Sequence, residues 1–191
     1  NMMYFLTQYF GFCFVISTTK KIPFRHMVTP GGKKINVSGT SMGDCGWYSD
    51  RRGYRYERID PITGNNWPKI PKNISSVVSN AAKKVGFGGF IPDSCFINCY
   101  KPGVALTAHI DQDEVDFSQP IVSVSLGVSA IFQIFGEKRN GKVINIPLHS
   151  GDLLIFGGPA RKFYHGVKKL KDQTHPLTNN LRINLTFRRA L

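Results

Sequence analysis

The second half of the chain shows the alternation of hydrophobic and polar positions that is typical of β-strands. The run Ile121–Leu126 (IVSVSL) alternates apolar and polar side chains, the period of a strand with one buried face. Turns rich in glycine and asparagine separate further short strands, predicted at 131–135, 143–146, 152–156, 163–167 and 183–187. Such a series of short strands is typical of a sandwich, a barrel or a jelly roll, so the predicted fold class is mainly β.

One segment of the chain has the apolar spacing of a helix instead. Valine and alanine side chains recur at helical intervals within 74–85. Asn73 is the predicted N-cap and Gly86 the predicted C-cap. The sequence thus predicts one amphipathic helix of about three turns that flanks the strands.

Residues 1–23 form an apolar N-terminal segment before the predicted domain of residues 24–191. The run Tyr9–Ile16 is strongly apolar, and the first positive charges, Lys20 and Lys21, follow it. A signal peptide carries positive charge before its apolar run, and a transmembrane helix needs about 20 apolar residues. We therefore expect an element that packs on the core, and no membrane association.

Charge narrows the choice of partner. The chain carries 25 lysines and arginines against 12 acidic residues, which gives a net charge of +13. A hydrophobic fraction of 41% excludes a disordered chain, and the glycines follow no collagen-like period. The positive excess favours a polyanionic partner, with nucleic acid ahead of a membrane surface.

The cysteines indicate a reducing compartment. The 4 cysteines are spaced too widely for a zinc knuckle or a dense disulfide framework. Cys95 and Cys99 share one face of a strand-like run, so we expect them to be thiols in or near the core.

The stretch 30–72 is dense in glycine and proline, which favours turns over long regular elements. It also interleaves aromatic residues with arginines, namely Trp47, Tyr48, Tyr54, Tyr56 and Trp67 with Arg51, Arg52, Arg55 and Arg58. Such a surface can stack bases and neutralise phosphates. The alternative is that the aromatic rings anchor the loop to the core, and both roles can hold for different residues.

A candidate metal site lies at His109 and Asp111. On an extended strand these two side chains project to the same side, so both can reach one ion. A second histidine would complete a two-histidine, one-carboxylate triad, the ligand set of non-haem Fe(II) oxygenases. His165, which ends a strand-like run, is preferred over His149 in a turn and His175 in a polar loop. The alternative is an ordinary strand histidine and a turn carboxylate.

The last predicted strand points to an anion site. Arg182, Asn184, Thr186 and Arg188 share one face, opposite an apolar face. Two arginines that face the interior of a barrel are costly unless an anion pairs with them, and a dicarboxylate could accept bidentate bonds from both. The alternative is a strand edge that faces solvent.

Together these residues resemble the AlkB family of Fe(II)/2-oxoglutarate-dependent dioxygenases, bacterial type. The resemblance extends from about Phe24 to Ala190. Its most specific stretches are Asn98-x-Tyr100-x-Pro-Gly103, His109-x-Asp111-x-Asp113-Glu114, Phe163–Gly166 and Arg182-x-Asn-Leu-Thr-Phe-Arg188. The chain departs from the family pattern at Cys99, Gln112 and Ile183, none of which is at a ligand position.

The resemblance implies a double-stranded β-helix (jelly roll) with a loop-rich nucleotide-recognition lid at about 28–72. It implies that the Fe(II) ligands, which are also the catalytic residues, are His109, Asp111 and His165. The residues implied to bind 2-oxoglutarate are Asn98, Tyr100, Arg182, Asn184 and Arg188. Substrate contacts are implied for Trp47, Tyr54, Asp113 and Arg139, with the target base held between Trp47 and His109.

The function implied by the resemblance is oxidative demethylation of N-alkylated bases such as N1-methyladenine and N3-methylcytosine in DNA, with release of formaldehyde. Such bases are cationic, so Asp113 and Glu114 would give a suitably acidic pocket. The alternatives are the same chemistry on RNA or on a protein, and a non-catalytic β-barrel that binds nucleic acid. We expect a monomer in the bacterial cytoplasm that uses Fe(II), 2-oxoglutarate and O2.

Overall fold

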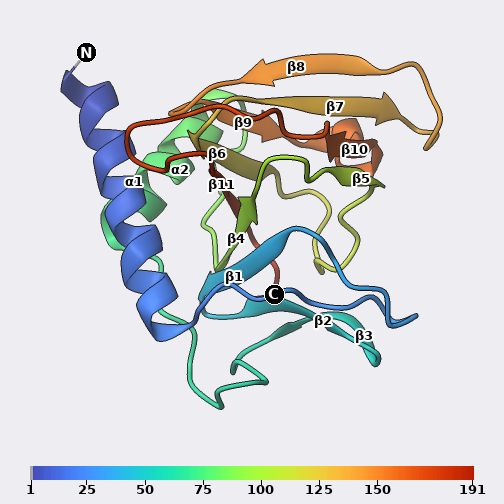
Figure 1. Ribbon diagram of the computed structural model, residues 1–191, viewed down its shortest axis with the longest axis horizontal. Helices are drawn as coiled ribbons and strands as arrows, with labels where there is room; N and C mark the ends of the chain where they lie inside the picture. Colours follow the sequence, from blue (N-terminus) through green and yellow to red (C-terminus); the bar gives the residue numbers. More distant parts are fainter. Residues whose placement is uncertain (1) are drawn as a thin grey trace.

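A computed structural model describes residues 2–191 and shows a sandwich of two antiparallel sheets (Figure 1). The larger sheet has the strand order β1 (Ser38–Gly43), β4 (Ser94–Tyr100), β11 (Arg182–Arg188), β6 (Ile121–Gly127) and β9 (Leu153–Phe156). The smaller sheet has the order β5 (Leu106–His109), β10 (Tyr164–Val167), β7 (Ala130–Gly136) and β8 (Ile144–Leu148). This arrangement confirms the predicted jelly roll, and each predicted strand is present with bounds shifted by one or two residues.

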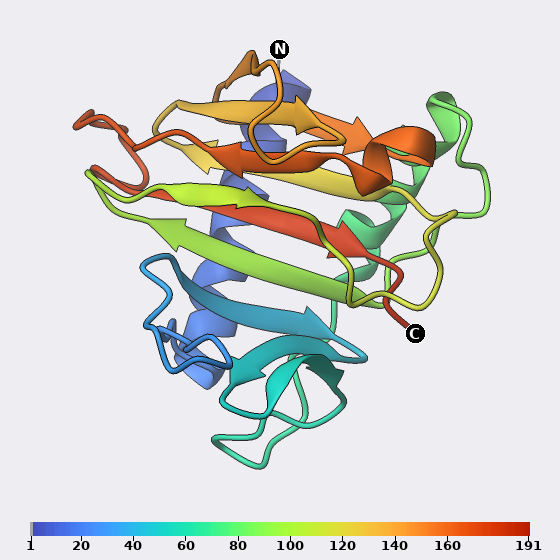
Figure 2. The ribbon, with the colours of Figure 1, turned by 90° about the vertical axis from the view of Figure 1, so that its right-hand side faces the viewer.

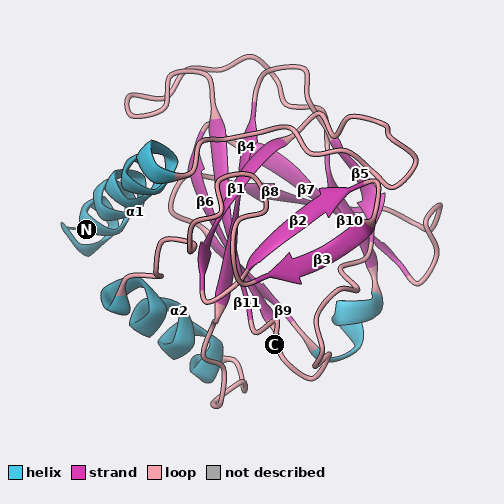
Figure 3. Cartoon of the chain, turned by 90° about the horizontal axis from the view of Figure 1, so that it is seen from below, coloured by secondary structure: helices cyan, strands magenta, loops and turns pink. Residues whose placement is uncertain are grey.

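Both α-helices, α1 (Met2–Lys21) and α2 (Lys72–Lys84), lie on one side of the strands, against the larger sheet (Figure 3). Val15 of α1 and Val78 of α2 are buried in one cluster with Ile97 and Leu185 of the sheet. The outward side chains of the central strands are therefore covered by apolar helix faces. This packing places the expected N-terminal element on the core.

The ends of α2 differ from the predicted caps. The helix begins at Lys72 with Pro71 in the N-cap position, so Asn73 lies inside the first turn. It ends at Lys84, and Val85 rather than Gly86 takes the C-cap position. Proline is favourable at a helix start because its fixed φ suits the helix and its missing N–H costs no hydrogen bond there.

The stretch 28–72 contains three strands in addition to its turns. β1 is an edge strand of the larger sheet, while β2 (Gly46–Asp50) and β3 (Gly53–Glu57) form a separate hairpin. The aromatic residues of this stretch divide as anticipated between anchoring and exposed positions. Trp67 is an anchor, because its ring is 3% exposed and its Nε1–H donates to the Glu57 carbonyl at 2.7 Å.

The cysteine and membrane expectations can be compared with the same structure. Cys95 and Cys99 are buried on the helix-facing side of β4, as predicted, and no disulfide links the described cysteines. No helix within residues 2–191 is long and apolar enough to cross a membrane.

The interior between the two sheets is unusual because much of it is polar. The alternation in β6 predicted a half-buried strand, yet both faces of β6 are covered. Its serines, Ser123 and Ser125, point into the sandwich toward Asn184 and Arg182 of β11. β11 is also a central strand rather than an exposed edge, so the polar faces of two strands meet inside the fold.

Candidate metal centre and anion pocket

The fold brings the three predicted metal ligands together at one end of the sandwich. His165 of β10 is the register partner of His109, the last residue of β5. Asp111 lies two residues beyond β5, in the connection that follows, and not on the strand as predicted. One ligand atom from each of the three residues lies within 4.8 Å of the others. His149 and His175 are not members of this cluster, so the preference for His165 agrees with the geometry.

Each histidine presents the same nitrogen to the cluster. Nδ1 of His109 lies 2.9 Å from the Thr107 carbonyl, and Nδ1 of His165 lies 3.1 Å from the Phe163 carbonyl. A carbonyl oxygen only accepts, so Nδ1 carries the proton and Nε2 is left with its lone pair. The Nε2 atoms of His109 and His165 lie 3.6 and 3.7 Å from the carboxylate of Asp111.

The protonation states at the cluster suit a divalent cation. Burial lowers the pKa of His165 to about 4, so its imidazole is neutral near pH 7. Burial by itself would raise the pKa of Asp111, but the Arg188 guanidinium and the two histidines hold it well below its usual range. Two imidazoles and one carboxylate form the ligand set of non-haem iron sites with open coordination positions.

Arg188 holds Asp111 from the side of the larger sheet. Its Nη2 lies 2.8 Å from Oδ2 of Asp111, and its Nε lies 3.0 Å from Oε1 of Glu114. The resemblance implied that Arg188 contacts the co-substrate. In the structure its guanidinium already pairs with the carboxylates of Asp111 and Glu114. A co-substrate could therefore contact Arg188 only alongside these two ion pairs.

Glu114 does not contribute the free negative charge expected of it. Its carboxylate is buried and accepts hydrogen bonds from the hydroxyl of Tyr56 at 2.7 Å and from Nη2 of Arg161 at 2.9 Å. Together with Arg188, two guanidinium groups therefore face Glu114 and Asp111. The acidic pocket expected from the sequence is reduced to Asp113, because the other two charges are paired.

Arg161 is the residue of this network that the sequence analysis missed. It is 1% exposed and lies in the short 3-10 helix η1 (Gly158–Lys162). Besides Glu114, it donates to the backbone carbonyls of Asp111 at 3.3 Å and Gln119 at 3.2 Å. It therefore braces the connection that carries Asp111, the candidate metal ligand. An arginine between Pro159 and an apolar strand gave no periodic signal that could have revealed its burial.

Arg182 is the strongest indication of an anion pocket. Its side chain is 1% exposed, and Nη2 donates to the Ser125 hydroxyl at 3.2 Å. Within residues 2–191, its Nε and Nη1 atoms have no hydrogen-bond partner. Burial lowers the pKa of Arg182 because the interior disfavours its charged form, and the phenol of Tyr100 opposes this. A carboxylate bound beside it would satisfy both atoms, so the residues present fit an acidic co-substrate.

Among the other predicted co-substrate residues, Tyr100 contacts Arg182, and Asn98 and Asn184 lie two positions along the same pair of strands. Tyr100 of β4 is the register partner of Arg182, and the guanidinium lies 5.0 Å from the centre of the Tyr100 ring. Asn98 is the register partner of Asn184 on the same pair of strands. The amide nitrogen of Asn184 donates to the Ser123 hydroxyl at 2.7 Å and to the Val124 carbonyl at 3.0 Å. Asn184 therefore serves the strand pairing, and its contact with a co-substrate stays a prediction.

The β2–β3 hairpin places two aromatic rings beside the metal cluster. Trp47 donates from Nε1 to Oδ2 of Asp113 at 2.7 Å, and its ring stacks on Tyr54 with centroids 5.8 Å apart. The ring of Phe96 meets Trp47 edge to face at 5.2 Å. Gly39 has no side chain because the Phe96 ring occupies the space of a Cβ atom there. Trp47 is thus fixed in orientation by its neighbours.

The predicted substrate arginine and the basic residues of the hairpin are placed differently. Arg139 is exposed in the β7–β8 connection, and its guanidinium lies 5.2 Å from the ring centre of Tyr164, next to His165. Arg55 forms ion pairs with Asp50 and Glu57 at 2.9 and 2.6 Å. Its charge therefore stabilises the hairpin and is not free for a phosphate.

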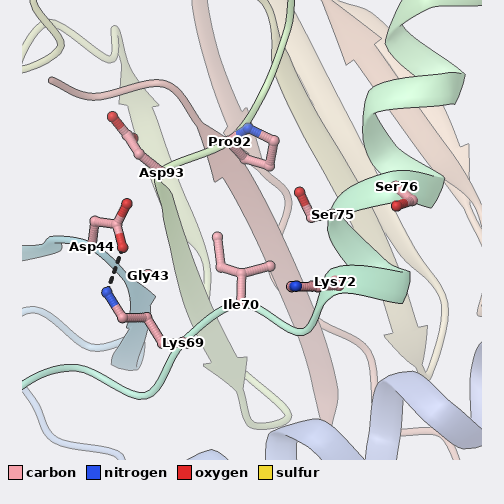
Figure 4. A pocket seen from close by; sticks show the side chains of 9 residues that line it. All are labelled: Gly43, Asp44, Lys69, Ile70, Lys72, Ser75, Ser76, Pro92 and Asp93. Atoms are coloured by element: carbon pink, nitrogen blue, oxygen red, sulfur yellow. Dashed lines mark hydrogen bonds and ion pairs between the residues drawn. The ribbon is translucent and has the colours of Figure 1, made fainter.

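Two surface cavities lie away from this cluster. One, of about 310 Å³, lies between the start of α2 and the start of β4 (Figure 4). Its rim carries an ion pair between Lys69 and Asp44 at 2.6 Å, both more than half exposed. The other, of about 560 Å³, lies between residues 23–28, the end of β2 and residues 62–63. Neither is lined by a predicted site residue.

Comparisons with known proteins agree with the geometry of the site. The sequence model described as 2OG-Fe(II) oxygenase superfamily matches residues 13–188. The chain is 49% identical over 168 residues to the alpha-ketoglutarate-dependent dioxygenase AlkB of Escherichia coli, covering 88% of this chain and 78% of that protein. It is 36% identical over 117 residues to the tRNA demethylase abh1 of Schizosaccharomyces pombe, covering 59% of this chain and 39% of that protein. The solved structure of OsALKBH1 matches with a TM-score of 0.71 and 31% identity, covering 87% of this chain and 84% of that one.

Proposed function

Because this chain belongs to the 2OG-Fe(II) oxygenase superfamily, and within it to the AlkB dioxygenases, we propose that it demethylates N-alkylated bases in DNA by oxidation. The enzyme class and the cofactors, Fe(II) with 2-oxoglutarate and O2, follow from the family. The observation that carries the proposal is the cluster of His109, Asp111 and His165, together with a buried arginine, Arg182, whose Nε and Nη1 atoms have no hydrogen-bond partner within residues 2–191.

We propose that Nε2 of His109, Nε2 of His165 and the carboxylate of Asp111 hold the iron. When bound, iron with 2-oxoglutarate supplies the oxidising power that breaks a C–H bond of the methyl group. Arg182 would hold the far carboxylate of 2-oxoglutarate, supported by the ring of Tyr100. Asn98, Asn184 and Arg188 are proposed to bind or position the same molecule.

The chain's own residues have defined tasks in this scheme. Arg188 and Arg161 hold Asp111 and the connection after β5 in place, so the carboxylate stays ionised and aimed at the cluster. Trp47 and Tyr54 offer an aromatic surface on which the target base can stack, opposite His109. Asp113 is the remaining carboxylate beside that surface, and it would attract a base that carries a positive charge. Arg139 is proposed to contact the substrate from the β7–β8 connection.

RNA is the second candidate substrate, and a specific observation supports it. The similarity to a tRNA demethylase extends over 59% of this chain. The chemistry at the methyl group is the same for both nucleic acids, so the residues named above would serve either. A competition between methylated DNA and methylated RNA, with a methylated peptide as a third substrate, separates the alternatives.

We also propose a single oxygenase domain over residues 24–191, with the lid at about 28–72, that works as a monomer in a bacterial cytoplasm. Support comes from the bacterial relatives and from the sheet that β1 and the following strands share. Size-exclusion chromatography with light scattering would measure the oligomeric state directly.

The test of the proposed function uses a single-stranded oligonucleotide with one N1-methyladenine. The protein is incubated with it, Fe(II), 2-oxoglutarate and ascorbate, and formaldehyde is measured. We expect turnover by the natural chain, loss of turnover in His109→Ala, and retention in His149→Ala, which changes a histidine outside the cluster. Turnover in His109→Ala would contradict the metal assignment, and no turnover by the natural chain on any methylated nucleic acid would contradict the function.

A further inference from the structure

Four exposed lysines gather at the end of the sandwich opposite the metal cluster. Lys168, Lys169 and Lys171 follow β10, and Lys101 lies in the β4–β5 turn. Figure 2 shows the two segments side by side at the end of the strands away from the C-terminus. We refer to these four residues as the lysine end.

Backbone hydrogen bonds hold the two segments of the lysine end together. Leu170 donates to the Val104 carbonyl at 2.8 Å, and Gly103 donates to the Leu170 carbonyl at 2.9 Å. Leu170 itself is 3% exposed, so the segment is anchored in the core between the exposed lysines. Cε of Lys169 lies about 4.0 Å from the position that a Cβ on Gly103 would take, which places this side chain over the β4–β5 turn. The lysines therefore project from a fixed backbone.

The positive charge of the lysine end is not paired with a carboxylate within residues 2–191. In the part of the chain that the structure describes, none of the four lysines forms an ion pair or a side-chain hydrogen bond, whereas Lys69 does. Asp172 is the acidic residue next to the group, and it forms no ion pair within residues 2–191 either. Ordered, unpaired positive charge of this kind favours a polyanionic partner.

The lysine end is within reach of a strand bound at the metal cluster. Lys168 follows His165 by three residues, and its N–H continues the pairing of β10 with β7 by donating to the Ile131 carbonyl at 2.9 Å. At about 3.3 Å per residue, Lys168 and Lys171 lie roughly 10 and 20 Å along the chain from His165. In a duplex one strand carries a phosphate about every 3.4 Å, so this distance corresponds to roughly three to six nucleotides.

We propose that the lysine end binds the phosphate backbone of the nucleic acid substrate several nucleotides from the target base. The inference rests on the proposed function and extends it, since it predicts that the enzyme prefers strands long enough to reach this surface. Phosphate contacts carry no sequence information, so the preference is for length and not for sequence.

The test compares two triple variants that remove equal charge. Lys168→Gln/Lys169→Gln/Lys171→Gln changes the lysine end, and Lys72→Gln/Lys83→Gln/Lys84→Gln changes exposed lysines of α2, which lies on the other sheet. Binding of labelled, unmethylated single strands of 20 and 3 nucleotides is measured by fluorescence anisotropy over a range of salt concentrations. The KM for methylated 20-mers is measured in parallel.

For the 20-mer, we expect the first variant to weaken binding about ten-fold and to reduce the slope of log K against log salt by about 2, since each phosphate contact contributes roughly 0.7. The second variant should bind like the natural chain, and the trinucleotide should not distinguish the proteins. Equal loss in both variants would overturn the inference. Binding to anionic phospholipid vesicles is measured as well. If the first variant binds the vesicles more weakly than the natural chain but binds the 20-mer equally well, the inference is also overturned. Failure of the natural chain to release formaldehyde would instead contradict the proposed function, whatever the binding data show.

Discussion

The indole nitrogen of Trp47 donates a 2.7 Å hydrogen bond to Oδ2 of Asp113, which joins the β2–β3 hairpin to the connection that carries Asp111. Burial raises the pKa of Asp113, although the hydrogen bond from Trp47 opposes this. Since Asp111 and Glu114 are paired with arginines and Asp113 forms no ion pair within residues 2–191, Asp113 is the carboxylate that we propose attracts a cationic base.

Asp113→Asn should therefore lower the activity on a cationic base more than the activity on a neutral base. The substitution keeps the shape of the side chain and removes its charge. We expect kcat/KM for N1-methyladenine to fall about ten-fold, with a loss of less than about two-fold for the neutral N1-methylguanine. The measurement is formaldehyde release from matched oligonucleotides. Equal losses on the two bases would show that Asp113 acts through the orientation of Trp47 and not through charge.

Removing one metal ligand should abolish tight metal binding without unfolding the chain. For His165→Ala we expect the Kd for Mn(II), titrated calorimetrically in place of Fe(II), to rise more than about 100-fold, beyond what loss of an outer hydrogen-bond partner costs. His149→Ala is the matched control, because His149 hydrogen-bonds the Ser129 hydroxyl and lies outside the cluster. Similar Mn(II) affinities in the two variants would contradict the assignment.

Arg182→Met should abolish the binding of 2-oxoglutarate and raise the stability of the fold. The substitution removes a buried charge with two unpaired donors, so the free energy of unfolding without 2-oxoglutarate should rise by about 1–4 kcal/mol. Thermal unfolding with Mn(II) present is expected to shift upward on adding 2-oxoglutarate in the natural chain, and to stay constant in the variant. A ligand-induced shift in Arg182→Met would show that the anion binds elsewhere.

The Glu114–Arg161 pair should stabilise the fold, in addition to holding the connection that carries Asp111 in place. Both side chains are at least 96% buried, so Arg161→Met removes one partner of a buried pair and should destabilise the fold by about 3–5 kcal/mol. Arg52→Met is a suitable comparison, because that arginine is 73% exposed and its ion pair with Asp50 should contribute less than about 1 kcal/mol. Urea unfolding measures both, and equal stabilities would disprove the buried role of Arg161.

Acid should weaken the ion pair that joins Asp60 in the lid stretch to Arg25, which lies just before that stretch. Asp60 is fully buried and accepts two hydrogen bonds from Arg25, at 2.7 and 2.8 Å. Burial alone would raise the pKa of Asp60, but the bonds from Arg25 and Thr63 lower it below its ordinary value. A lowered pKa stabilises the fold above the unfolded value of about 3.9, and this contribution is lost as the pH falls through the lowered pKa.

Asp60→Asn is expected to cost about 2 kcal/mol at pH 7, and the difference from the natural chain should shrink below about pH 4. Urea unfolding of both proteins at pH 7, 5 and 3 measures this difference. A constant difference across this range would mean that the charge of Asp60 is not what holds the lid stretch.

Much of the site could be predicted from the sequence because it depends on local periodicity. The alternation in β11 put Arg182 and Arg188 on one face, and the pattern around His109 supplied two ligands within three residues. Side-chain direction along a strand has a period of two, so such statements need no knowledge of the rest of the chain. His165 is preferred as the third ligand because it ends a strand-like run, and the resemblance to AlkB dioxygenases implies the same residue.

The sequence alone determined the types of residue at the site, the strand faces that carry them and the family. Only the tertiary structure decided which charges are free. Glu114 is neutralised by Arg161, which lies 47 positions away, and Ser125 meets Arg182 across 57 positions. The physical reason is that ionic and hydrogen-bond partners in a jelly roll come from strands and connections distant in the chain. Within residues 2–191, Arg182 keeps two donors without a hydrogen-bond partner, and for this reason we propose that an anion binds there.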